Sequence, residues 1–157
     1  MCLGIRYRVA GETVQVLFGP FSSKIPVLYR GGQVVLFEWG DDGRDVIKQP
    51  QLGPLKTWPQ TCCVPLETVK RGEWDYLRPK PCKVMATAFA LKDLQGITRW
   101  FDVPNGMCLQ GLHASPWYEP KVYLVTVPAN ENQVHIAERW MRMVPQGHGA
   151  SGEEVSR

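Results

Sequence analysis

Proline and glycine recur along this 157-residue chain, and they constrain its fold more than any other sequence feature. The 13 prolines and 15 glycines separate short apolar runs, so few segments are long enough to form an extended helix. A chain of this length favours one domain with a core of its own. Its hydrophobic content of 44% is that of an ordinary folded protein and argues against disorder over most of the chain.

The apolar runs between these breaks predict about seven strands by alternation and turn signals. Gly31-Gly32 and Pro104-Asn105-Gly106 each separate two such runs, and both intervals predict a β-hairpin. A short helix is expected over residues 66–77, and a capping pattern at Asn130 and Gln133 predicts another over residues 130–142. The expected strands are Val14–Phe18, Ile25–Arg30, Gln33–Trp39, Lys83–Leu91, Ile97–Val103, Met107–His113 and Lys121–Val127.

These elements predict an α+β fold, because helical segments do not alternate with strands as they do in a parallel doubly wound sheet. We expect a single domain over residues 1–145, with a curved, mainly antiparallel sheet or barrel-like core and one or two short helices. Residues 146–157 are polar and rich in Gly and Ser, which is typical of a flexible C-terminal tail.

Composition narrows the functional classes. No window is apolar enough to cross a membrane, and no signal peptide is recognisable, so we expect a cytoplasmic protein without a membrane partner. The five cysteines are odd in number and form no C-x-x-C pair, which argues against a disulfide framework or a metal site. No cofactor is expected. The net charge of +3 is compatible with a polyanionic partner, and nothing in the sequence predicts an oligomeric state.

Cys2 is the residue with the most distinctive chemistry. Removal of Met1 leaves one residue that carries both a free α-amine and a β-thiol. The amine has a pKa of about 7.7–8.0, so an appreciable fraction is unprotonated at cellular pH and can act as a base or nucleophile. An amine and a thiol on adjacent carbons can close a thiazolidine ring with an aldehyde, which makes Cys2 a candidate nucleophile. A cysteine at this position can equally be incidental.

Several short motifs, taken in order, resemble the SOS-response-associated peptidase family, also called the abasic-site-processing proteins. The resemblance covers roughly residues 1–145 and depends on the order and spacing of the motifs. The matching segments are Met1-Cys2-Leu3-Gly4, Phe37-Glu38-Trp39-Gly40, Glu67-Thr68-Val69, Cys82-Lys83-Val84, Gln110-Gly111-Leu112, Leu124-Val125-Thr126, Ala129-Asn130 and Ile136-Ala137-Glu138-Arg139.

The resemblance implies a protein of the DNA damage response. In this family the N-terminal cysteine removes the initiator methionine and traps the aldehyde of an abasic site in single-stranded DNA. An asparagine, a glutamate and a histidine assist it. In this chain those three positions hold Cys63, Leu91 and Ala137, and Pro65 replaces a neighbouring motif arginine. His135, two residues before Ala137, is the one candidate for a replacement acid or base, with a solvated surface histidine as the alternative.

Candidate DNA-binding residues follow from both the residue types and the resemblance. Arg6 and Arg8 flank Tyr7 close to Cys2, and basic residues interleaved with an aromatic suit single-stranded nucleic acid. The same stretch also fits a strand with one buried face. Arg139 matches the motif arginine and can hold a phosphate, or it can serve surface electrostatics. Trp39 can stack on a base or belong to the core.

Three hypotheses remain open at this point. The first is covalent capture of abasic single-stranded DNA through Cys2. The second is a family member without catalysis that binds nucleic acid or a protein, which the loss of the three assisting residues favours. The third is a cysteine peptidase, for which His135 is the available partner of the thiol.

Overall fold

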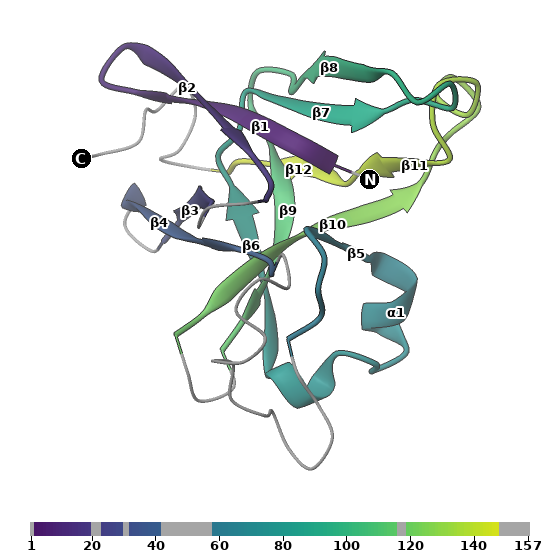
Figure 1. The fold of residues 1–157 in the computed structure, drawn as a ribbon. Helices are drawn as coiled ribbons and strands as arrows, with labels where there is room; N and C mark the ends of the chain where they lie inside the picture. Colours follow the sequence, from purple (N-terminus) through teal and green to yellow (C-terminus); the bar gives the residue numbers. More distant parts are fainter. Residues whose placement is uncertain (1, 20–22, 30–31, 42–57, 116–118, 148–157) are drawn as a thin grey trace.

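The computed structural model describes residues 2–19, 23–29, 32–41, 58–115 and 119–147 (Figure 1). This part of the chain is mostly β-structure, with a closed five-stranded barrel, a separate antiparallel sheet and one short α-helix. The α+β fold class expected from the sequence is therefore confirmed. No helix among these residues is long and apolar enough to cross a membrane.

The barrel closes through its two longest strands. Its order is β10-β4-β3-β6-β9, and β9 pairs back onto β10. The β4–β10 pairing is parallel and the others are antiparallel. Three short strands extend the barrel where the long ones diverge: β5 and β11 pair with β10, and β12 pairs with β9. The bounds are β3 Lys24–Leu28, β4 Val34–Trp39, β5 Cys63–Pro65, β6 Pro79–Val84, β9 Met107–Ala114, β10 Lys121–Pro128, β11 Arg139–Met141 and β12 Met143–Pro145.

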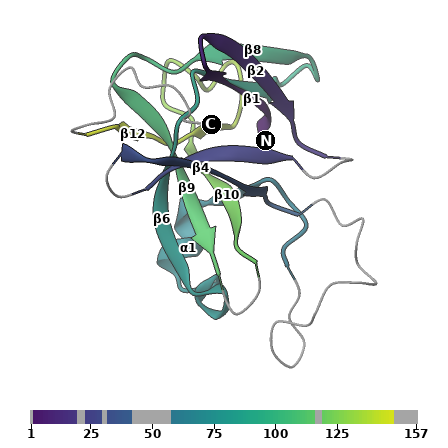
Figure 2. The same ribbon diagram turned by 90° about the vertical axis from the view of Figure 1, so that its left-hand side faces the viewer.

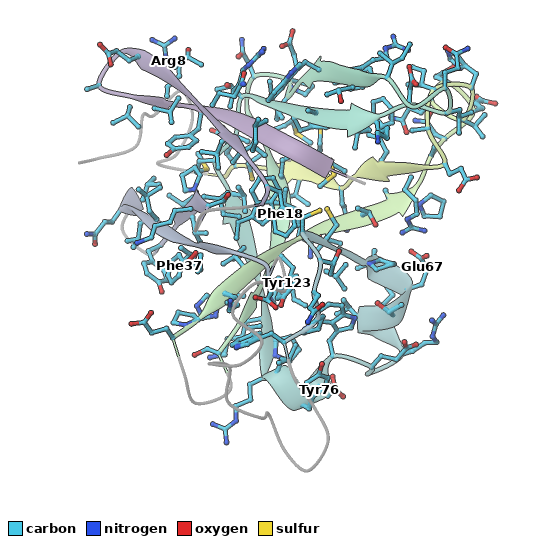
Figure 3. All side chains as sticks on the ribbon, viewed as in Figure 1. Arg8, Phe18, Phe37, Glu67, Tyr76 and Tyr123 are labelled. Atoms are coloured by element: carbon cyan, nitrogen blue, oxygen red, sulfur yellow. The ribbon has the colours of Figure 1, made fainter. Side chains whose placement is uncertain are left out.

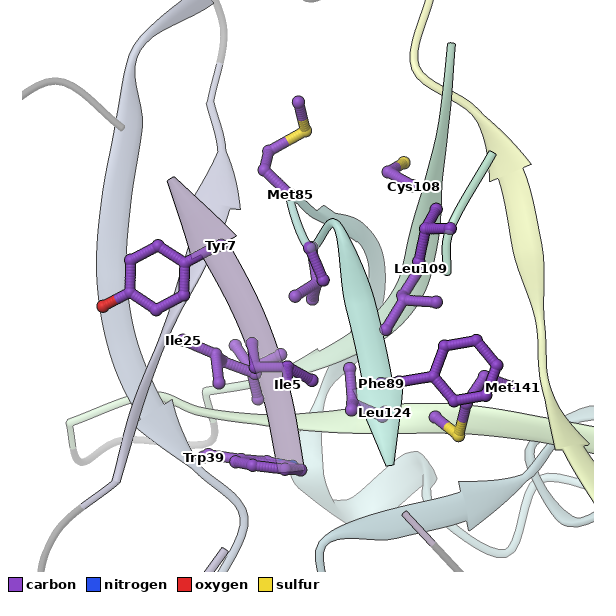
Figure 4. Packing of buried hydrophobic residues seen from close by; sticks show 14 of the residues in the cluster. Ile5, Tyr7, Ile25, Trp39, Met85, Phe89, Cys108, Leu109, Leu124 and Met141 are labelled. Atoms are coloured by element: carbon purple, nitrogen blue, oxygen red, sulfur yellow. The ribbon is translucent and has the colours of Figure 1, made fainter. Parts of the chain in front are cut away.

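The second sheet has four antiparallel strands in the order β2-β1-β7-β8 and lies above the barrel in Figure 1. Its inner face supplies Ile5, Tyr7 and Phe89, each at most 5% exposed, which pack in one cluster with Leu109 and Leu124 of the barrel (Figure 4). The main core therefore lies between the sheet and the barrel. The bounds are β1 Cys2–Val9, β2 Glu12–Leu17, β7 Ala88–Lys92 and β8 Thr98–Asp102.

Strand β10 is buried on both faces, because successive side chains alternate between two clusters. Val122 and Leu124 face the main core, whereas Tyr123 and Val125 belong to a second cluster. The second cluster is covered by α1 (Leu66–Lys70) and by the 3-10 turn η2 (Asp75–Leu77).

Four sequence predictions differ from this structure. The helix expected over 66–77 breaks into α1 and η2 around Gly72, whose φ of +80° interrupts the helix. The strand expected over Lys83–Leu91 divides into β6 and β7, which belong to different sheets. The Asn105-Gly106 turn forms, but β8 pairs with β7 and β9 pairs with β6, so the predicted hairpin is wrong.

The helix expected over 130–142 is also wrong. The side chain of Gln133 accepts a hydrogen bond from the backbone N–H of Asn130 (3.1 Å), as a capping pattern predicts. This local signal supports only a run of turns, after which Arg139–Met141 pairs with β10. Of the predicted C-terminal tail, residues 148–157 lie outside the described residues.

Candidate functional site

The backbone of Cys2 begins β1 at an interior position of the four-stranded sheet. The Cα of Cys2 lies opposite Leu91 of β7, and the register shifts between Cys2 and Gly4, so Leu3 is the extra residue of a β-bulge. The side chain of Cys2 lies outside the described part of the molecule. Its predicted role as a nucleophile therefore stays a prediction.

The three positions at which the resemblance implies an assisting residue belong to one apolar cluster. Cys63 is 8%, Leu91 1% and Ala137 4% exposed, and all three pack in the main core. The side chains of Leu91 and Ala137 hold no ionisable group. The structure thus places all three positions in the main core, where their side chains offer little acid–base chemistry.

Cys63 itself is paired with its neighbour. The Sγ atoms of Cys63 and Cys62 are 3.3 Å apart and form a buried hydrogen bond. This bond and then burial raise the pKa of the Cys62 thiol far above its usual range. Cys62 is consequently held as a neutral thiol, unsuited to act as a base.

His135 lies on the run of turns over residues 131–136, and it is exposed. These turns contact the β7–β8 turn, because the backbone N–H of Leu94 donates to Ile136 O (2.9 Å). The helix expected to present His135 to Cys2 does not form. The solvated alternative fits this surface position, and the peptidase hypothesis gains no support from it.

Arg139 is a structural clamp. Its Nη1 and Nη2 donate to the two carboxylate oxygens of Glu67 (2.8 and 3.0 Å), its Nε donates to Thr126 Oγ1 (3.1 Å), and its Nη2 also donates to Thr126 O (2.9 Å). These bonds use four of the five N–H donors of a guanidinium. Arg139 is thus engaged mainly within the fold, and its predicted contact with a DNA phosphate stays a prediction.

The bonds from Arg139 change the pKa of the Glu67 carboxylate. Hydrogen bonding from Arg139 lowers the pKa of Glu67 from 4.5 to about 2. Glu67 lies on α1 (Figure 3), so the ion pair ties the helix to the edge formed by β10 and β11.

Trp39 also proves to be a core residue. Its side chain is 2% exposed, its Nε1 donates to Cys62 O (3.0 Å), and its ring meets Phe18 edge-on at 5.4 Å. A ring that is buried to this extent has no free face on which a base could stack. The predicted stacking role of Trp39 is therefore corrected, and the core alternative holds.

Arg6 and Arg8 lie on the outward face of the four-stranded sheet. Alternation along β1 buries Ile5 and Tyr7 and leaves Arg6 half-buried and Arg8 exposed, so the strand interpretation of this stretch is confirmed. Arg8 lies on the β1–β2 hairpin (Figure 3), where its guanidinium donates to Gly11 O (3.0 Å).

The guanidinium of Arg6 lies 3.9 Å from the centroid of the Trp100 ring, and its Nε donates to Gln15 Oε1 (3.0 Å). We call Arg6 and Trp100 together the Arg6–Trp100 platform. A guanidinium stacked on an indole is a favourable cation–π pair. It places the guanidinium over one face of the indole, on the outward surface of the sheet.

Small residues beneath the indole explain why it lies flat. In the sheet register Gly4 is opposite Ala90, and Ala90 is opposite Trp100, so the ring crosses β7 to reach β1. A Cβ placed on Gly4 would lie 3.2 Å from Cη2 of Trp100. Ala90 is 0% exposed although it is on the outward face, because larger side chains cover it.

The sequence reasoning missed Trp100. A usable signal existed, since alternation in 98–102 puts Trp100 and Phe101 on opposite faces, and Phe101 packs with the core. Alternation also places exposed Lys92 on the outward face, at the end of β7 that pairs with Cys2. Asp102 is a countercharge on that face.

No family model, no curated protein and no solved structure matched this chain in the comparisons with known proteins.

Proposed function

We propose that this protein binds single-stranded DNA on the outward face of the four-stranded sheet and captures abasic-site aldehydes through Cys2. The observation that carries the proposal is the Arg6–Trp100 platform, which lies on the same sheet and partly on the same strand as Cys2. An aromatic ring accepts any base by stacking, and nearby guanidinium groups neutralise phosphates.

Each part of the platform has a distinct task in this proposal. One base stacks on the outer plane of the Arg6 guanidinium, which lies over the half-buried ring of Trp100, an interaction worth about 1–3 kcal/mol. Trp100 holds the guanidinium in place from below, and Arg6 with Arg8 supplies positive charge along β1. Binding should therefore tolerate many sequences and weaken as salt rises.

The capture step needs little beyond Cys2. The α-amine adds to the aldehyde carbon and loses water to form an imine, and the thiol then adds across that imine, its proton moving to the nitrogen to close the thiazolidine. Every reacting group of the protein belongs to one residue. The apolar side chains of Leu91 and Ala137 provide no general base for removal of Met1. We therefore assign that removal to a cytoplasmic methionine aminopeptidase.

A second candidate function is binding without capture. It is favoured by the burial of Cys63, Leu91 and Ala137 in the apolar cluster, because the groups that assist catalysis in the family are replaced there. In this case the sheet face has the same ligand, but Cys2 stays unreactive.

Fluorescence anisotropy with a labelled single strand tests the shared part of both candidates. Trp100→Ala should weaken binding about 5- to 150-fold, which corresponds to the loss of one stacked base. Lys70→Ala, which removes an exposed charge on α1, is the matched surface control and should bind as the wild type does. Equal affinity of Trp100→Ala and the wild type would refute the proposal.

Intact mass then separates the two candidates. Protein that lacks Met1 should gain the mass of an abasic single strand less one water, and Cys2→Ala should not. Binding without any adduct would establish the second candidate and exclude capture.

A further inference from the structure

A cavity of about 740 Å³ is lined by Arg8 of β1 and Asp102 of β8, each two residues along its strand from a member of the Arg6–Trp100 platform. Its volume is within the range of small-molecule sites. Three parts of the chain form its walls: the corner between β6 and β7, the turn between β8 and β9, and the residue after β12. The lining residues are Arg8, Met85, Ala86, Thr87, Asp102, Val103, Pro104, Asn105, Gly106, Met107 and Gln146.

Backbone hydrogen bonds hold these walls together. The N–H of Thr87 donates to Arg6 O (2.7 Å), and the N–H of Val103 donates to Thr87 O (2.8 Å), so the corner continues the pairing of the four-stranded sheet. The N–H of Gln146 donates to Gly106 O (2.9 Å). These bonds fix the main chain around the cavity. They also connect the β6–β7 corner to β1, because Thr87 is bonded to Arg6.

One part of the lining suits the face of a planar ring. Met85 is 7% and Val103 8% exposed, and Met107 is half-buried and packs against the same core cluster. Thioether groups make favourable contacts with aromatic rings and adapt to their shape. Apolar walls with a few polar groups are typical of sites for heterocyclic ligands.

The polar part of the lining is rich in acceptors. Nε2 of Gln146 donates to Met107 O (3.0 Å), which fixes the orientation of the amide. Oε1 of Gln146 is then a buried acceptor without a hydrogen-bond partner among the described residues. An unpaired buried acceptor destabilises the fold, and a donor on a ligand would relieve this cost. The carboxylate of Asp102 is another acceptor in the lining.

We infer that this cavity binds a nucleobase that carries an exocyclic amino group, with the attached phosphate directed to Arg8. The ring lies against Met85 and Met107, and the amino group donates to Gln146 or Asp102. Adenine, guanine and cytosine have such donors, whereas thymine has none in its exocyclic groups. A carboxylate that accepts from a base is a recognised means of base selection.

If the bound base is part of a DNA strand, this inference rests on the proposed function. The base would then belong to the nucleotide next to the one stacked on the platform. A free nucleotide has the same chemistry. The two sources are separated by measuring nucleotides and strands independently.

The test is a titration followed by NMR of methionine methyl groups labelled with ¹³C. Addition of dGMP or dCMP should shift the Met85 and Met107 signals, assigned with the Met85→Leu and Met107→Leu variants. Met141 is 2% exposed and does not line the cavity, so its signal is a control within the same sample. Unchanged Met85 and Met107 signals, or equal shifts at Met141, would overturn the inference.

Base selection is tested with Asp102→Asn, a substitution at an exposed position. Affinity for the preferred one of dGMP and dCMP should fall about 5- to 150-fold, and dTMP should bind more weakly than that nucleotide to the wild type. Glu131→Gln removes the same charge on the 131–136 turns and should have no effect. Equal affinity of the wild type for all three nucleotides would refute the assignment of a base pocket.

Failure of the proposed function would look different. If nucleotides shift Met85 and Met107 while single strands bind equally well with and without Trp100, the cavity is a free-nucleotide site and the platform proposal is wrong. If strands need Trp100 but the methyl signals do not move, the platform stands and the base pocket is refuted.

Discussion

Substitution of Gly4 by alanine tests the packing on which the Arg6–Trp100 platform depends. An added Cβ would lie 2.8 Å from Leu17 Cδ2, 2.9 Å from Val16 O and 3.2 Å from Trp100 Cη2. The leucine can rotate away. The carbonyl of Val16 belongs to the paired backbone of β2, so the new methyl group must displace a strand or lift the indole.

The expected cost follows from these contacts. Overpacking of this kind costs about 1–3 kcal/mol. Replacing a glycine by alanine also raises the free energy of unfolding by about 0.4–1 kcal/mol, because it lowers the conformational entropy of the unfolded chain. The net loss in the free energy of unfolding should be about 1–2 kcal/mol, which for a chain of this size lowers the Tm by roughly 2–8 °C.

Urea unfolding measures the stability of Gly4→Ala, and anisotropy measures its affinity for a single strand. Both should fall, because the methyl group displaces Trp100. Gly111→Ala is the matched control: its Cβ would lie 2.8 Å from Cys82 Sγ and 2.9 Å from Val84 Cγ2, inside the barrel. It should lose stability and keep its affinity. Wild-type stability and affinity in Gly4→Ala would refute the packing of Trp100 over β1.

Two further predictions concern ionisable groups. Because Arg139 lowers the pKa of Glu67 from 4.5 to about 2, the pair stabilises the fold fully above pH 4.5 and loses this contribution as the pH falls toward 2. Glu67→Gln should therefore be less stable than the wild type at neutral pH, with a difference that narrows across this window in urea titrations; a constant difference would contradict the coupling. Burial raises the pKa of Cys82 to about 12 and of Cys108 to about 11, so iodoacetamide at pH 8 should alkylate them far more slowly in the native protein than in urea, as mass mapping would show. Equal rates in both conditions would contradict their burial.

Turn chemistry predicted where the chain reverses, but not always which strands pair. The interval after Tyr29 gives a true hairpin, since β3 and β4 pair with Val27 opposite Val35. The turn at Gly106 is equally real, with φ of +81°, yet its two strands enter different sheets. A turn signal describes four residues, whereas pairing is decided by where each strand buries its side chains.

Tertiary contacts explain why a strand forms at the end of the segment expected to be a helix, residues 130–142. The ring of Trp140 lies 4.6 Å from that of Phe101 and 5.8 Å from that of Phe89. These contacts require an extended segment that crosses from β10 to β9. No local pattern in the sequence contains the partners of Trp140, which are about 40 and 50 residues away in a chain whose strand order is non-sequential.

The same limit applies to the candidate site. Cys2, Arg6 and Arg8 could be predicted as one group because they are neighbours in sequence. Trp100 was missed because its place on the surface depends on Gly4 and Ala90, which lie on two other strands. Trp39 was misassigned for the converse reason, since the residues that enclose it are distant in sequence.

The most direct test of binding at the sheet face is photo-crosslinking of a single strand that contains 5-iodouracil, followed by mass mapping of the crosslinked residue. We predict a crosslink at Trp100 that is lost in Trp100→Ala, since a base is expected to stack on the Arg6–Trp100 platform. Tyr29 is 45% exposed and lies on the barrel. Crosslinking at Tyr29 in place of Trp100 would contradict binding on the four-stranded sheet.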